Sequence, residues 1–279
     1  MRMLTSLILA ALLLATGPVL AGTLDRIKET GTLRIGYRVD AAPYSYRNSI
    51  GDPAGYTVTL CQTVGLGLEK MLGIDTIRFE YVEVGTNDRF DAVESGRVDL
   101  LCGATTATLS GREKVDFSLP TFVDGASVMY RENGPKSFKE LAGRNVGVRA
   151  NTTTERALTS TLENLELDAN VVAVTDHEKA LEMLEAGKLD AYFADRVILQ
   201  YLIAGRSITA MRVSPENFSV EPYALGLKRG DNEFRLAVDR ALSVIYSGRT
   251  IVEIFRRSFG NIEPSEALRT LYLISALPE

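Results

Sequence analysis

Two hydrophobic patterns alternate along the chain. Short apolar runs, such as residues 33–37 and 77–84, are followed by segments in which apolar residues recur every three or four positions, such as residues 56–72 and 178–186. The first pattern is typical of buried strands and the second of amphipathic helices. Strands that alternate with helices predict an α/β fold built on mostly parallel sheets.

One unit of this alternation occurs twice. A predicted helix ends at Gly96 before a strand that Asp99 opens, and another ends at Gly187 before a strand that Asp190 opens, with the same spacing. Two lobes of similar βαβ construction explain the repeat. Because turns of the helix–glycine–strand type are common, chance similarity is the alternative explanation.

Turn-forming residues mark where one lobe gives way to the next. Residues 131–135 form such a break, and residues 220–227 have the pattern of a strand that returns to the first lobe. We therefore expect lobe 1 to comprise residues 22–129 and 223–279, and lobe 2 to comprise residues 130–222. The two crossings would form a two-stranded hinge of the kind used in domain closure.

The N-terminus has the pattern of a secretory signal peptide. Arg2 precedes an apolar run over residues 4–14, and the small residues Val19 and Ala21 follow it. This order predicts cleavage after residue 21 and export to the periplasm. An uncleaved N-terminal anchor is the alternative, although the apolar run is short for a membrane span.

Composition and motifs exclude several functional classes. The 279-residue chain has a net charge of −5 and no run of Lys or Arg, which argues against nucleic acid as a partner. No Walker loop, HExxH segment, nucleophile elbow or GxGxxG after a strand occurs, so we expect no metal or cofactor and do not expect an enzyme. The single histidine and many carboxylates still leave a hydro-lyase open.

The two cysteines, Cys61 and Cys102, have neither CxxC nor metal-ligand spacing. Cys61 lies in a predicted helix and Cys102 at the end of a predicted strand in the same lobe, so pairing is geometrically possible. In an oxidising compartment, a lone pair of cysteines often forms a disulfide. Two buried free thiols are the alternative.

Polar residues collect where the predicted strands end, which is the edge of an open α/β sheet at which ligands bind. The set combines cations, hydroxyls and helix N-termini with one acid, and so suits a small anion that also carries an amino group. Its members are Arg38, Arg89, the stretch 102–113, Thr152, His177 and Asp195. Each also has a purely structural interpretation: a solvated arginine, a helix-capping threonine or aspartate, or an exposed histidine at a helix start.

The stretch 102–113 connects an apolar strand to a row of small and hydroxylated residues. Small residues allow a ligand to approach the backbone, and hydroxyls and free N–H groups can bind a carboxylate. Ser110, with Glu113 three positions later, predicts a capping box that opens a short helix.

Five segments spread over the chain carry a resemblance to a known family. They are Gly36-Tyr37-Arg38, Gly55-Tyr56, Cys102-Gly103-Ala104-Thr105-Thr106, Asp116-Phe117-Ser118-Leu119-Pro120 and Asp176-His177. With them, nearly all of the mature chain resembles the extracellular solute-binding proteins (family 3) of polar amino-acid ABC transporters. Within that family it is most similar to the glutamate/aspartate-binding branch.

The resemblance implies a type II periplasmic-binding-protein fold, with two lobes that close on one amino acid and dock on a membrane permease. It also implies three groups of ligand contacts. The side-chain carboxylate would lie at Arg38, Thr86, Arg89 and His177, the α-carboxylate at Ala104, Thr106, Thr152 and Thr153, and the α-ammonium at Asp195.

Two departures from the family pattern concern the α-carboxylate. Ala104 stands where the acidic-ligand branch usually has serine, and Gly111 stands where the family's carboxylate-binding arginine is expected. Arg112 comes one residue later, which on a helix is a rotation of about 100°. Either Arg112 swings into the site, or the ligand is not a standard α-amino acid.

We therefore expect a monomeric periplasmic binding protein that takes glutamate, aspartate or a related small carboxylate and passes it to the permease of an ABC importer. Two alternatives use the same fold. One is a periplasmic dehydratase of the cyclohexadienyl type, which would act on prephenate or arogenate. The other is a sensory ligand-binding module.

Overall fold

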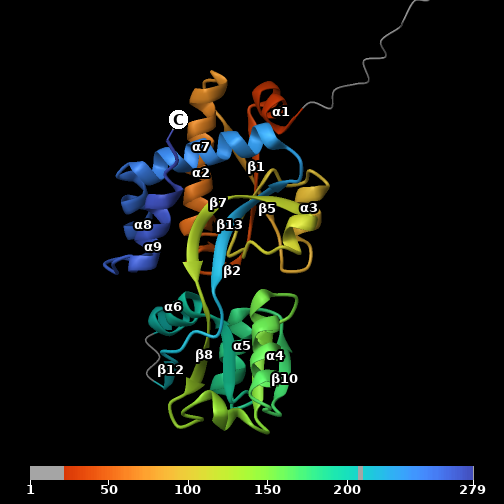
Figure 1. Cartoon of the computed structure of the whole chain (residues 1–279), viewed down its shortest axis with the longest axis vertical. Helices are drawn as coiled ribbons and strands as arrows, with labels where there is room; N and C mark the ends of the chain where they lie inside the picture. The colour runs from red at the N-terminus through yellow and green to blue at the C-terminus, as the bar shows by residue number, and fades with distance from the viewer. Residues whose placement is uncertain (1–21, 207–209, 279) are drawn as a thin grey trace, which may run out of the picture.

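The computed structural model describes residues 22–206 and 210–278, which form two lobes, each built around its own five-stranded sheet (Figure 1). The predicted signal peptide, residues 1–21, lies outside the described residues. No helix of the described part is both long and apolar enough to cross a membrane.

The first sheet belongs to lobe 1. Its strands, in spatial order, are β5 (Arg78–Glu83), β1 (Thr32–Tyr37), β6 (Leu100–Cys102), β13 (Glu221–Lys228) and β7 (Val115–Asp124). The first three run parallel, and β13 runs antiparallel to both of its neighbours. The carboxyl ends of β1 and β6 therefore meet at one edge of the sheet. A small antiparallel sheet lies beside it and contains β2 (Asp40–Ala41), β3 (Ser45–Arg47) and β4 (Pro53–Ala54).

The second sheet repeats this plan in lobe 2. Its strands, in spatial order, are β10 (Asn170–Val174), β9 (Asn145–Arg149), β11 (Ala191–Asp195), β8 (Ala126–Arg131) and β12 (Met211–Val213). The first three are again parallel, whereas β8 runs antiparallel to β11 and β12. The repeated unit seen in the sequence is thus a repeated sheet topology.

Helices flank both sheets. In lobe 1 they are α1 (Thr23–Thr30), α2 (Tyr56–Leu72), α3 (Arg89–Glu94), α7 (Asn232–Ser247), α8 (Thr250–Phe259) and α9 (Glu266–Ser275). In lobe 2 they are α4 (Thr153–Asn164), α5 (His177–Glu185) and α6 (Arg196–Arg206). The described residues also include two 3₁₀ turns, η1 (Gly111–Glu113) and η2 (Phe138–Leu141). The bounds predicted for α2 are confirmed to the residue.

The chain passes between the lobes along two adjacent strands (Figure 1). The first crossing is at Gly125, between β7 of the first sheet and β8 of the second, and the return enters β13 at Glu221. A Cβ atom at residue 125 would lie 2.7 Å from the Ser219 carbonyl oxygen, so this approach requires glycine. The boundary expected between residues 129 and 130 falls inside β8, because the strands change sheets at this close contact instead.

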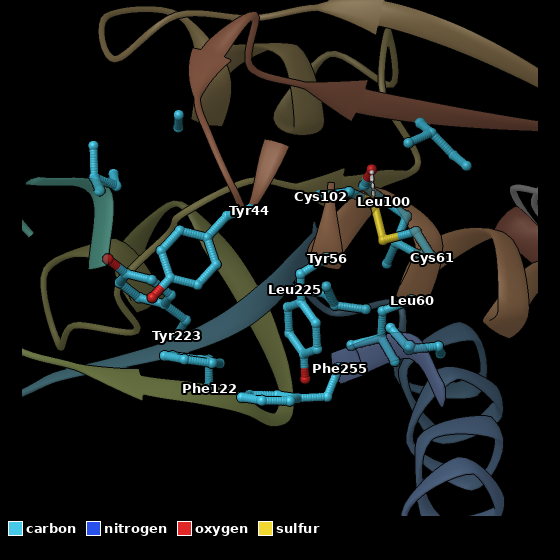
Figure 2. Close-up of a cluster of buried hydrophobic side chains, with 14 of the residues drawn as sticks. Tyr44, Tyr56, Leu60, Cys61, Leu100, Cys102, Phe122, Tyr223, Leu225 and Phe255 are labelled. Carbon is cyan, nitrogen blue, oxygen red and sulfur yellow. Dashed lines mark hydrogen bonds between the residues drawn. A yellow bond between two sulfur atoms is a disulfide. The ribbon is translucent and has the colours of Figure 1, made fainter. Parts of the chain in front are cut away.

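An aromatic cluster fills the core of lobe 1 next to the hinge (Figure 2). Tyr44, Tyr56, Phe122 and Tyr223 are almost fully buried, and the Tyr44 ring packs edge-on against Phe122 and Tyr223 with centroids 5.0 Å apart. Such contacts stabilise a core by about 0.5–1.5 kcal/mol per pair beyond the buried area. This packing fixes the strands that lead into both crossings.

A disulfide joins the same core to the edge of the sheet where β6 ends (Figure 2). Cys61 of α2 bonds to Cys102, the last residue of β6, with Cα atoms 6.4 Å apart. The bond closes a separation of 41 residues. It anchors the start of the loop that follows β6.

Candidate functional site

A cavity of about 450 Å³ lies between the two lobes, at the edges where their parallel strands end. Both lobes contribute to its wall. Eight of the ten predicted ligand contacts line it: Arg38, Thr86, Arg89, Ala104, Thr106, Thr152, Thr153 and Asp195. The structure brings these eight together although they are spread over more than 150 positions of the sequence; Arg112 and His177 are not part of the wall.

Two arginines of lobe 1 make one end of the cavity cationic. Arg38 follows β1, and Arg89 is the first residue of α3. The Nε atom of Arg89 is buried with no hydrogen-bond partner in the described structure, while Nη1 donates to the Thr86 carbonyl oxygen. Burial and the charges of Arg38 and Arg156 lower the Arg89 pKa to about 10, so Arg89 stays charged at neutral pH. An unpaired buried donor of this kind favours an anion.

Behind Arg38, a carboxylate joins the two lobes. One Asp40 oxygen accepts from Arg38, at 3.0 Å from Nε and 2.8 Å from Nη2. The other accepts from Nη1 of Arg149, the last residue of β9 in lobe 2. The exposed fractions of these side chains are only 6% for Arg38, 14% for Asp40 and 10% for Arg149. Burial, followed by the charge of Arg38, lowers the Arg149 pKa to about 10.

His177 lies deeper than the cavity wall. It is the first residue of α5, it is 3% exposed, and its Nδ1 is 2.6 Å from the Tyr192 hydroxyl. Burial, followed by the charges of Arg38 and Arg149, holds the His177 pKa well below its usual value. The imidazole is therefore neutral at pH 7. The interpretation as an exposed residue at a helix start is wrong, because α5 packs this end against the strands of lobe 2.

The N-terminus of α4 supplies neutral donors on the lobe 2 side. Thr152 caps the helix, with its hydroxyl 3.1 Å from the Glu155 amide nitrogen, and thus has its predicted structural role while also lining the cavity. Thr153 reaches across the cleft, where its hydroxyl oxygen is 3.2 Å from that of Thr106. A second bridge runs from Asn151 Nδ2 to Asn87 Oδ1 at 2.7 Å. These contacts hold the lobes together over the cavity.

The hinge end of the cavity is acidic. Asp195, the last residue of β11, lines the wall, and its Oδ1 is buried without a hydrogen-bond partner in the described structure. Burial and the nearby charges of Asp124 and Glu221 raise its pKa well above the usual value, against smaller opposing effects of the adjacent Tyr223 hydroxyl and of Arg38. Burial likewise raises the Asp124 pKa to about 6. Glu221 accepts from the hydroxyls of Thr106 and Ser219, at 2.5 and 2.6 Å. A cationic group placed here would pair with Asp195.

The loop after β6 lines the cavity with small residues and no arginine. Gly111 faces the cavity, but the Arg112 guanidinium lies over the Phe117 ring, 5.6 Å from its centroid, outside the wall. The structure thus does not bring Arg112 to the site, since the turn keeps the register expected from counting residues along the chain. The predicted cap at Ser110 is also wrong. Ser110 does precede η1, but its backbone is helical and its side chain makes no capping bond; the Thr108 hydroxyl accepts from the Gly111 amide at 2.9 Å instead.

Several residues that contribute to the site were missed in the sequence. Asn87, Lys114 and Arg156 line the cavity, and the Asp40–Arg149 pair lies behind it. Arg149 could have been found by the rule that located Arg38, because it also ends a parallel strand. The link from Asp40 to Arg149 had no such signal, since Arg149 belongs to the other lobe. Within the described residues, no group of three or more His, Cys, Asp or Glu side chains is arranged to hold a metal ion.

Comparison with known proteins identifies the family from most of the chain. Residues 33–261 match the family described as bacterial extracellular solute-binding proteins, family 3. The chain belongs to this family. The family assignment made from the sequence is confirmed, and this solute-binding protein has the two-lobed fold expected of it.

Similar proteins cover nearly the whole length of this solute-binding protein. The L-glutamate/L-aspartate-binding protein of Pseudomonas aeruginosa is 31% identical over 98% of this chain and 92% of its own. The glutamate/aspartate import solute-binding protein of Escherichia coli is 24% identical over 92% of this chain and 86% of its own. Both relatives are named as binding proteins for glutamate and aspartate, and the second is also named for their import.

Solved structures agree with the fold. A solute receptor for L-cysteine from Neisseria gonorrhoeae superposes with a TM-score of 0.78 over 89% of this chain and 99% of its own, at 22% identity. An ancestral amino-acid-binding protein, described as a precursor of cyclohexadienyl dehydratase, gives a TM-score of 0.74 over 86% of this chain and 100% of its own, at 24% identity. At this level of identity the likeness concerns the fold alone.

Proposed function

We propose that this protein is a monomeric periplasmic receptor that binds an acidic amino acid, glutamate or aspartate, and delivers it to the permease of an ABC importer. The observation that carries the proposal is the pairing of unsatisfied charges in one cavity. The Arg89 Nε donor and the Asp195 Oδ1 acceptor are both buried, both at the cavity, and both without a partner in the described structure.

A zwitterion with a second carboxylate would satisfy each part of this cavity. The α-ammonium pairs with Asp195, and one carboxylate pairs with Arg38 and Arg89. The other carboxylate accepts from the amides at the N-terminus of α4, where the helix dipole favours an anion, because the hydroxyls of Thr106 and Thr152 already donate to Glu221 and to the Arg149 carbonyl. The loop after β6 offers this second carboxylate no arginine, because Gly111 and not Arg112 lines the cavity there. Besides Arg38 and Arg89, the cations in the described wall are Lys114 and Arg156. Two relatives named for glutamate and aspartate support the same ligand class.

The cavity is poorly equipped for acid–base chemistry. Among the described residues, Asp195 is the only carboxylate in the wall, and the neutral His177 is buried outside the wall, hydrogen-bonded to Tyr192. A dehydratase needs a base and an acid placed at the substrate. We therefore propose a binding function without catalysis, and expect no turnover of prephenate or arogenate.

Isothermal titration calorimetry with the mature protein tests the proposal. We expect glutamate or aspartate to bind with a micromolar dissociation constant, which corresponds to about −8 kcal/mol. Succinate and glutarate, which lack the ammonium group, serve as matched controls and should bind at least a hundredfold more weakly. Absence of binding of both amino acids below 1 mM would overturn the ligand class.

A further inference from the structure

The ion pair between Asp40 and Arg149 lies behind the cationic wall of the cavity. Arg38 connects the two regions: it lines the cavity and also donates two hydrogen bonds to one Asp40 oxygen. The other Asp40 oxygen accepts a hydrogen bond from Arg149 in the opposite lobe. The Asp40 carboxylate is therefore already bound to the Arg38 guanidinium, to which a ligand carboxylate would also bind.

A guanidinium has five N–H donors, so Arg38 can serve two carboxylates at once, but those two carboxylates repel each other. The repulsion acts at short range between groups with little exposure to water, where screening is weak. Arg149 opposes it, because its charge attracts both. Asp40 and Arg149 thus act on a ligand in opposite directions and through the same arginine.

We propose that Asp40 and Arg149 are a specificity-determining pair that sets, through Arg38, how strongly the cavity prefers a ligand with a side-chain carboxylate over its neutral amide. The inference rests on the proposed function and concerns its selectivity. Asp40 lowers the preference for the ligand with the side-chain carboxylate over its amide, and Arg149 raises that preference.

The net charge of the cluster gives the expected order of variants. Arg38, Asp40 and Arg149 together carry +1, since two cations surround one anion, and neutral His177 adds nothing. Asp40→Asn raises this charge to +2, and Arg149→Gln lowers it to 0. The double variant, with both substitutions, returns it to +1.

The experiment measures the ratio of the glutamate and glutamine dissociation constants by calorimetry for these four proteins, and repeats it with aspartate and asparagine. We expect the preference for the acid to rise about tenfold or more in Asp40→Asn and to fall about tenfold or more in Arg149→Gln, a change of the size that one charge-assisted hydrogen bond contributes. The double variant should return to within about threefold of the wild type.

Two controls separate specificity from damage. Asp52→Asn changes the chain by the same charge at an exposed loop position and should leave the ratio unchanged. Asp40→Asn leaves two buried arginines facing each other, which could lower the stability of the folded protein. Thermal unfolding is therefore measured for each variant. Loss of stability or a common weakening of both ligands would lower both affinities without moving their ratio.

A ratio that moves in the same direction in both single variants, or does not move, overturns the inference while the proposed function stands. Failure of the wild type to bind any of the four amino acids overturns the proposed function, and the inference with it. Opposite shifts with recovery in the double variant support the pair as a determinant of specificity.

Discussion

The two ends of the cavity handle buried charge in different ways. At the cationic end, the positive charges of Arg38 and Arg149 are partly balanced by Asp40, while the Arg89 Nε has no partner in the described structure. At the hinge end, Asp195 faces the charges of Asp124 and Glu221 and, more weakly, that of Arg38, and no ion pair with Lys or Arg is found for these acids among the described residues.

The difference separates a permanent charge from a titratable one. An arginine keeps its proton under any physiological condition, so the cationic end needs counter-ions, which the protein supplies only in part. A carboxyl group can take a proton and become neutral, so the acidic end can exist without a cation. In the proposed complex, the ligand ammonium would therefore compete with a proton on Asp195, whereas the ligand carboxylate would compete with Asp40 for Arg38.

The largest effect should come from removing the charge at the hinge end. Asp195→Asn keeps the shape of the side chain but loses the ion pair with the ammonium, so we expect affinity for glutamate or aspartate to fall a hundredfold or more. Calorimetry measures it, with Asp168→Asn, exposed on lobe 2, as the matched control. A loss of less than tenfold would mean that the ammonium does not lie at Asp195.

The corresponding change at the cationic end should be smaller, because two arginines line the cavity there and both would bind the carboxylate in the proposed complex. Arg89→Gln removes one guanidinium and leaves Arg38, so affinity should fall by about ten- to a hundredfold. Arg97→Gln is the matched control, since Arg97 pairs with Asp88 and is about half exposed. If Arg89→Gln costs no more than Arg97→Gln, the carboxylate lies elsewhere in the cavity.

The titratable groups at the hinge end should also make the free energy of unfolding of the ligand-free protein depend on pH. The Asp124 pKa is raised from 3.8 to about 6, so between these values the folded chain binds more protons than the unfolded chain. The contribution of Asp124 to the free energy of unfolding is therefore fully present below pH 4 and is lost as the pH rises through about 6. Two pKa units correspond to about 3 kcal/mol.

Urea unfolding at pH 4 to 7 tests this dependence against Asp124→Asn, in which the amide can still accept from Tyr44, 2.8 Å away in the native protein. The stability of the variant should decline less than that of the wild type over this interval. Equal slopes would show that the acidic end does not hold a proton in the folded state.

The smallest effect concerns the loop between the two ends. Because the Arg112 guanidinium packs on Phe117 outside the cavity, Arg112→Ala should change amino-acid affinity less than twofold. The same calorimetric titration checks it. A tenfold loss would show that Arg112 turns inward when ligand binds, as the family pattern suggests.

Local sequence rules predicted the fold well, because strand and helix periodicity and strand-end placement depend on neighbours in the chain. The bounds of α2, the cap at Thr152 and the strand-end positions of Arg38 and Asp195 follow from such rules. Features set by contacts between lobes were missed. The crossing at Gly125 depends on the carbonyl of Ser219, and the role of Asp40 depends on Arg149, 109 positions away.

The bridges across the cleft also govern how long a bound molecule stays. A ligand enclosed between the Thr106–Thr153 and Asn87–Asn151 contacts cannot leave until these bonds break. Its residence time is then limited by the rate at which the lobes part, a motion of microseconds to milliseconds or slower, as well as by its own bonds to the cavity. Two receptors with equal affinity but different bridges would therefore release the same cargo at different rates.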